Sequence, residues 1–140
     1  GTINKKLEEV IMKTVAAFAN SQGGTLLIGV GDDGEVIGLE PDYHSLGGVD
    51  RDKFELHLRN LLNQQFGTGF VTSKVVVKFH EVEEKEVCQI ETAAAKEPVI
   101  LIVKDKNGQL TEKFYARSGN SSQEIPLSEM NAYIKERFHS

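Results

Sequence analysis

The chain has a single cysteine, Cys88, and no tryptophan among its 140 residues. One cysteine excludes an internal disulfide and a cysteine-based metal site, and chains without disulfides are typical of the reducing cytoplasm. No apolar run approaches the roughly 20 residues that a membrane-spanning helix needs. An excess of basic residues is also missing, because the formal net charge is −5. We therefore expect a cytoplasmic protein without membrane contact, in which any nucleic-acid binding is confined to a local patch.

The residues that are present are typical of a globular protein, with 39% hydrophobic and 26% charged residues. The length fits a single domain, residues 1–140. Apolar residues three and four positions apart predict a first helix over Lys5–Ala19. A second helix is predicted from an N-cap at Asp50 to Gly67, and a third from an N-cap at Ser128.

Runs of apolar and β-branched residues alternate with turn signals along the rest of the chain. They predict strands at 25–30, 35–39, 74–82, 86–92, 99–103 and 112–117, and a polar loop at 118–125. This order of elements predicts a single α+β domain, with a mostly antiparallel, mixed sheet of about six strands and three helices.

Gly29, Gly31 and Gly34 form a G-x-G-x-x-G pattern, which in dinucleotide-binding folds lies between a strand and a helix. A helix does not fit after Gly34, because the residues that follow are β-branched and Pro41 comes soon afterwards. Residues 32–34 instead predict a hairpin turn in which Gly34 adopts a positive φ. We therefore expect neither a nucleotide-binding loop nor a bound cofactor.

Two separated segments carry a resemblance to a known family. Residues 13–30 read KTVAAFANSQGGTLLIGV, and residues 113–122 read KFYARSGNSS. Together with FELHLRNL at 54–61, they resemble the Schlafen/AlbA-type DNA-binding domain, also described as a divergent AAA domain, from Asn4 onward. The resemblance implies a nucleic-acid-binding domain of a bacterial, transcription-regulator-like protein.

In that family a glutamate-rich strand of the type E-S-x-x-x-E-F-K precedes the first helix, and this sequence starts after that position. In RNA-cleaving vertebrate relatives, two glutamates of that strand act with an aspartate that matches Asp32. The resemblance therefore implies no catalysis by this chain, and Asp32 is a catalytic candidate only if the chain is a nuclease. Asp32 and Asp33 are explained by turn chemistry, so no metal site is expected. The alternatives are a metal-dependent nuclease or NTP-binding domain, and an oligomerisation or interaction module, which the net charge favours.

The polar segment at 117–122 is the strongest candidate for contact with a phosphate backbone. Arg117 can grip a phosphate through two N–H groups, and the residues after it add small donors. Alternation predicts that Tyr115 and Arg117 share a strand face, where a ring can stack on a base. The predicted nucleic-acid-binding residues are Tyr115, Arg117, Ser118, Asn120, Ser121, Ser122, Asn20, Gly23 and Gly24. The structural alternatives are a hydrophilic loop in which Arg117 pairs with a carboxylate of the domain, and a helix C-cap at 20–24.

The expected partner is a nucleic acid, with the choice between DNA and RNA left open.

A second expectation concerns assembly. The strand next to the absent family strand is left with unpaired N–H and C=O groups, and such an edge invites pairing with another chain. Because relatives with two copies of the domain place them side by side, we also expect a homodimer.

Overall fold

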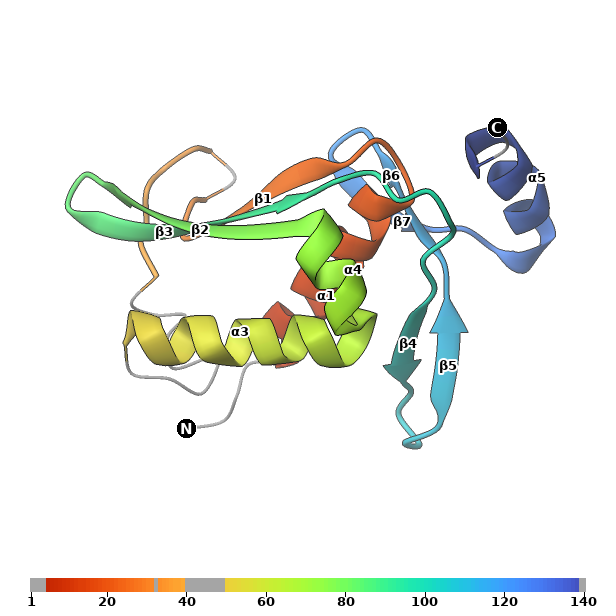
Figure 1. Cartoon of the computed structure of the whole chain (residues 1–140), viewed down its shortest axis with the longest axis horizontal. Coiled ribbons are helices and arrows are strands. Elements are labelled where there is room, and N and C mark those ends of the chain that lie inside the picture. The colour runs from red at the N-terminus through yellow and green to blue at the C-terminus, as the bar shows by residue number, and fades with distance from the viewer. Residues whose placement is uncertain (1–4, 32, 40–49, 139–140) are drawn as a thin grey trace.

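The computed structural model describes residues 5–31, 33–39 and 50–138 (Figure 1). The helices are α1 (Lys5–Ala19), α3 (Arg51–Phe66), α4 (Thr68–Lys74) and α5 (Leu127–Phe138). The strands are β1 (Gly24–Ile28), β2 (Val75–Val82), β3 (Lys85–Thr92), β4 (Leu101–Lys104), β5 (Leu110–Lys113), β6 (Tyr115–Ser118) and β7 (Ser121–Glu124). In this part of the chain, all paired strands run antiparallel, so the fold is α+β.

A three-stranded sheet with the order β1-β3-β2 forms the centre of the fold. Ile90 in β3 lies opposite Leu26 of β1 and Val77 of β2. Because side chains alternate along a strand, this register places Ile90 on the same face as Leu26 and Val77, and the next pairs add Ile28, Phe79 and Cys88. Figure 1 shows α3 and α4 along that side of the sheet, with α1 behind them.

The hydrophobic core lies between this face and the helices. Helix α3 contributes Phe54, Leu58 and Leu62, which recur every four residues and are fully buried. Helix α1 contributes Ile11 and Val15, which are equally buried. Burial of each such side chain contributes about 1.5–3 kcal/mol, so these two helices and the sheet supply most of the apolar stabilisation.

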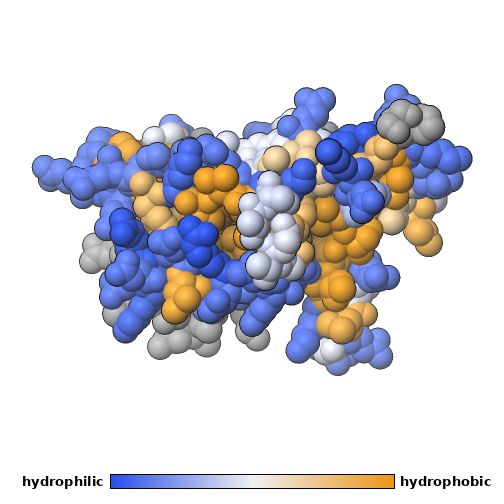
Figure 2. Space-filling view, in the orientation of Figure 1, coloured by the Kyte–Doolittle hydropathy of each residue, from blue (hydrophilic) through white to orange (hydrophobic). Residues whose placement is uncertain are grey.

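The C-terminal part forms two small hairpins and a last helix. Strands β4 and β5 pair with each other, β6 and β7 pair with each other, and β6 packs on α1. Figure 1 shows the β4–β5 hairpin projecting from the body and α5 at one end of the molecule. Figure 2 shows hydrophobic residues on this projecting hairpin, where Ile102 and Leu110 are 47% and 70% exposed.

Several sequence-based expectations are confirmed. Helix α1 has the predicted bounds. Helix α3 is capped by Asp50, whose side chain accepts a hydrogen bond from the backbone N–H of Lys53, and it ends at Gly67 with φ +88°. The α+β class and the antiparallel pairing are also as expected.

The counts differ, because the described residues contain four helices and seven strands in three separate sheets. Helix α4 was not predicted, since its sequence TGFVTSK contains poor helix formers. It is held by packing: Val71 is buried and the rings of Phe66 and Phe70 lie 5.3 Å apart. The predicted strand at 35–39 is reduced to a single bridge between Val30 and Val36.

The largest correction concerns 112–125. The predicted strand at 112–117 is interrupted at Phe114, whose ring packs edge-on against Tyr133 at 5.7 Å. The predicted loop at 118–125 contains β7, joined to β6 by a two-residue turn in which Gly119 has φ +61°. Ser128 does not cap α5, because the helix already begins at Leu127.

The glycine pattern forms a hairpin, as the sequence predicts. The N–H of Gly31 donates to the carbonyl of Glu35, and the N–H of Gly34, at φ +85°, donates to that of Gly31. No helix follows in the described residues up to Leu39. Over the described ranges, no helix combines the length and apolarity needed to span a bilayer.

Candidate nucleic-acid interface

Arg117 lies in the β6–β7 hairpin, where it pairs in register with Ser122. Its Nη1 donates to Ser122 Oγ at 2.9 Å, and its guanidinium carbon lies 4.9 Å from the centre of the Phe18 ring. A guanidinium over an aromatic face is attracted by the negative charge of the ring face. These two contacts hold the half-buried side chain in one place without neutralising its charge.

The expected alternative, in which Arg117 pairs with a carboxylate, finds no support among the described residues. The ion pairs observed there join other side chains, such as Arg59 with Glu55. A guanidinium has five N–H donors, and Ser122 accepts from one of them. Arg117 therefore keeps both its charge and donors for an incoming anion.

The end of α1 fixes the strand that carries Arg117. The backbone N–H of Arg117 donates to Ser21 Oγ at 2.8 Å, and Tyr133 Oη lies 3.4 Å from the same oxygen. Tyr133 also donates to the carbonyl of Asn20 at 2.6 Å. Ser21 thus joins α1, β6 and α5 at one point.

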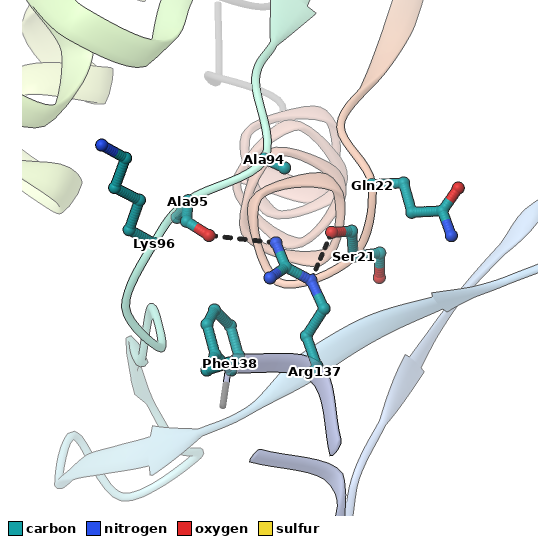
Figure 3. Close-up of a pocket in the computed structure, with 7 residues that line it drawn as sticks. All are labelled: Ser21, Gln22, Ala94, Ala95, Lys96, Arg137 and Phe138. Atoms are coloured by element: carbon teal, nitrogen blue, oxygen red, sulfur yellow. Dashed lines mark hydrogen bonds between the residues drawn. The ribbon is translucent and has the colours of Figure 1, made fainter. Parts of the chain in front are cut away.

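Arg137 of α5 is bound to the same segment in a different way. Figure 3 shows its guanidinium directed at the carbonyls of Ser21 and Ala95, and it also donates to the carbonyl of Ala19. These carbonyls include the negative end of the α1 dipole, which favours a cation. Arg137 lines a hollow of about 780 Å³, and its Nε and Nη2 donate to three backbone carbonyls, so its main contacts stabilise the fold.

Asn20 is completely buried and serves the fold. Its side-chain N–H₂ donates to the carbonyls of Val99 and Tyr115 at 2.8 and 2.9 Å, and its Oδ1 accepts from the N–H of Val99 at 2.8 Å. Because burial and these bonds use the amide fully, it has no group left for a ligand.

Gly23 and Gly24 are required by close packing. A Cβ on Gly23, at φ +80°, would lie 2.7 Å from the carbonyl oxygen of Thr92. A Cβ on Gly24 would lie 2.5 Å from the Phe18 ring. Gly23 therefore allows close approach to the backbone at the end of β3, and Gly24 allows the chain to pass the Phe18 ring, which in turn supports Arg117.

Tyr115 is 6% exposed and belongs to the hydrophobic core. Its ring lies 5.6 Å from Lys13 Nζ and is too deeply buried to stack on a base. The aromatic partner of Arg117 is instead Phe18, which sequence reasoning missed because Phe18 fits the apolar face of a helix. Ser21 was missed as an anchor because nothing in the sequence signals its contact with a strand 96 residues away.

The remaining predicted residues surround the hairpin turn. Ser118 and Asn120 are exposed on either side of Gly119, and Ser121 and Ser122 are half-exposed. The structure thus gathers Arg117 and these four small polar residues at the accessible end of one hairpin, whereas Tyr115 and Asn20 are buried.

Asp32 lies outside the described residues. Its neighbour Asp33 is exposed, and its Oδ1 accepts from the N–H of Glu35 at 3.0 Å, which is an ordinary turn contact. Within the described ranges, no three His, Cys, Asp or Glu side chains are grouped as a metal site requires.

Comparison with known proteins identifies the family and supports the fold. A family model described as Schlafen, AlbA_2 matches residues 2–126. The chain belongs to the Schlafen AlbA_2 family. Membership associates the domain with nucleic acids. The match includes β6 and β7 and ends before α5.

A similar fold occurs in the crystal structure of the DIP2311 protein from Corynebacterium diphtheriae. The two superpose with a TM-score of 0.60 over 96% of this chain, at 23% sequence identity. This chain spans 23% of the length of that protein. At this identity the likeness shows a shared fold alone.

Proposed function

We propose that this Schlafen AlbA_2 domain binds DNA or RNA through phosphate contacts at the β6–β7 hairpin. The observation that carries the proposal is Arg117, a cation held by Ser122 and Phe18 and without a carboxylate partner among the described residues. Ser118, Asn120 and the backbone around Gly119 add neutral donors beside it.

The distribution of charge also favours nucleic-acid binding on the side of the molecule that carries the β6–β7 hairpin. Residues 94–140 carry seven Lys or Arg and six Asp or Glu, a net charge of +1, whereas residues 1–93 carry a net charge of −6. The exposed acids Glu81, Glu83 and Glu84 lie at the tip of the β2–β3 hairpin. Figure 1 shows this tip at the opposite end of the molecule from α5. A polyanion therefore meets least repulsion at the C-terminal hairpins.

The wider role follows from the resemblance and the family. We propose that the domain acts as the nucleic-acid-binding module of a bacterial transcription-regulator-like protein in the cytoplasm, and we assign it no catalytic step. Its fold neighbour is a much longer chain, which fits a module joined to other domains.

A fluorescence-anisotropy titration with labelled single- and double-stranded DNA and RNA, at two salt concentrations, tests the proposal. We expect binding that weakens as salt rises, because phosphate contacts release counterions. The preferred probe identifies the nucleic acid. Absence of binding to all four probes at low salt would overturn the proposal and favour a protein-interaction module.

We also propose a homodimer formed through β1, whose outer edge has no partner in the described part of the chain. In a two-fold antiparallel pair, residues near the axis meet their own copies, so a charge there is repelled. The β1 sequence GTLLI has no charge and no proline, whereas the other edge strand, β2, carries Lys78 and Glu81. Beside β1 lies an apolar groove of about 290 Å³ lined by residues such as Val10 and Leu27.

Light scattering over a range of protein concentrations tests the dimer. We expect a dimer mass for the natural chain and a monomer mass for Leu27→Lys, which places a charge on the edge strand. Val76→Lys is the matched control, because Val76 is 47% exposed on β2 and Leu27 is 45% exposed on β1. A monomer at every concentration, or equal effects of both variants, contradicts this assembly.

A further inference from the structure

A groove of about 560 Å³ lies close to the Arg117 hairpin, between α1, the β4–β5 hairpin and the start of β6. Four lysines from three different segments line it: Lys13, Lys104, Lys106 and Lys113. The buried ring of Tyr115 forms part of its lining, with Lys13 Nζ 5.6 Å from the ring centre. The fold thus collects cations that are up to 100 residues apart in sequence.

The acids of the groove form a direct ion pair with only one of these lysines. Glu124 pairs with Lys113 at 3.2 Å. Asp105 accepts hydrogen bonds from the backbone N–H groups of Asn107 and Gln109, at 2.8 and 2.9 Å, within the hairpin turn. The third acid, Glu9, is exposed on α1.

Among the described residues, Lys13, Lys104 and Lys106 have no carboxylate within ion-pair distance. Lys104 and Lys106 are exposed on the projecting hairpin, and Lys13 is half-buried. With four lysines and three carboxylates in its lining, the groove carries a net charge of +1 on a chain whose net charge is −5. Such a concave cationic surface concentrates anions.

We propose that this groove binds further phosphates of the same nucleic-acid strand that Arg117 holds, an inference that rests on the proposed function. Tyr115 and Arg117 are two residues apart on β6, which corresponds to about 6.6 Å along the strand. Phosphates of a stacked strand recur about every 3.4 Å along its axis. A strand bound at Arg117 therefore reaches the lysines of the groove within a few nucleotides, and the binding site is an extended track rather than a single anion pocket.

The double variant Lys104→Ala/Lys106→Ala tests this track, because both side chains are exposed and their removal leaves the core intact. The control is Lys53→Ala/Lys78→Ala, which removes the same charge from α3 and β2. The probes are a labelled single strand of about 10 nucleotides, long enough to span both positions, and a trinucleotide. Free ATP and inorganic phosphate are separate probes.

For the longer strand we expect the Lys104/Lys106 variant to bind about three- to tenfold more weakly, with a salt slope smaller by about 1.4, the value for two phosphate contacts on a single strand. Trinucleotide binding is unchanged, and the control double variant behaves as the natural chain. If the two double variants bind the longer strand with equal affinity, the groove does not contribute to binding. The proposed phosphate contact at Arg117 would be unaffected by that result. Lysine-dependent binding of ATP or phosphate, without an effect on the longer strand, overturns the polynucleotide assignment. If the natural chain binds none of the strands, the proposed nucleic-acid binding itself is wrong.

Discussion

The region built from α1, α3 and the three-stranded sheet is held together differently from the region built from the β4–β5 and β6–β7 hairpins and α5. Helix α3 buries Phe54, Leu58 and Leu62, whereas α5 buries none of its residues. Helix α5 is attached instead by hydrogen bonds from Tyr133 and Arg137 to backbone carbonyls at the end of α1. Apolar packing fixes the first region. The second region adds a few buried apolar residues, such as Leu101 and Tyr115, and depends on polar contacts to position α5 and the strand that carries Arg117.

The largest effect is expected in the apolar region. Phe54→Ala removes a fully buried ring and is expected to lower the free energy of unfolding by about 4 kcal/mol, through lost transfer energy and a cavity. Urea denaturation measures the change. Leu56→Ala on the same helix is the control, because Leu56 is 62% exposed, and a shift within about 0.5 kcal/mol is expected there. Equal losses from both variants would contradict the assigned core.

Loss of the hydrogen bonds made by Asn20 is expected to reduce stability less than loss of the Phe54 ring. Asn20→Ala removes the partner of three backbone groups, at Val99 and Tyr115, and is expected to destabilise the fold by about 2–3 kcal/mol. The same urea titration applies, with the exposed Asn60→Ala as the control. If Asn20→Ala changes stability no more than Asn60→Ala, hydrogen bonding does not hold the C-terminal hairpins in place.

Arg117→Ala tests whether the polar region carries the function. We expect nucleic-acid binding to weaken by about 1–3 kcal/mol and the salt slope to fall by about 0.7–0.9, because one charge-assisted phosphate contact is lost. Arg117→Lys keeps the charge without the two-pronged geometry, so a partial loss is expected. Arg59→Ala, on the exposed face of α3, is the control that leaves affinity unchanged. A lower melting temperature with unchanged affinity would show that Arg117 has a structural role alone.

The smallest expected effect is a pH dependence of stability caused by Cys88, a buried residue of β3 in the central sheet. Burial, then the charge of Glu55, raises the pKa of the Cys88 thiol to about 12. A raised folded-state pKa stabilises the fold below the unfolded-state pKa of about 9, and this contribution is lost as the pH rises from there toward 12. We therefore expect a loss of about 1 kcal/mol between pH 9 and pH 10 that Cys88→Ala lacks. Identical slopes for the two proteins would show that the thiol is not buried in solution.

The sequence determines the apolar region because its signals are local and repeated. The bounds of α1 follow from apolar spacing, and those of α3 from Asp50 and Gly67, since caps and glycine conformation act within a few residues. The glycine hairpin is predictable for the same reason. Strand β7 was missed although Gly119-Asn120 is a recognised two-residue turn, because its serines have weak strand preference.

The candidate site depended on the tertiary structure. Arg117 and Arg137 are equally polar in the sequence. In the structure Arg137 donates to the carbonyls of Ser21, Ala19 and Ala95. Arg117 instead lies on Phe18, and its guanidinium donates to Ser122. Likewise, alternation along β6 pairs Tyr115 with Arg117, but packing on α1 buries the tyrosine ring. The type of side chain is set by the sequence alone. Whether its donors face backbone, solvent or a ligand is decided by contacts between segments about 100 residues apart, which no local pattern records.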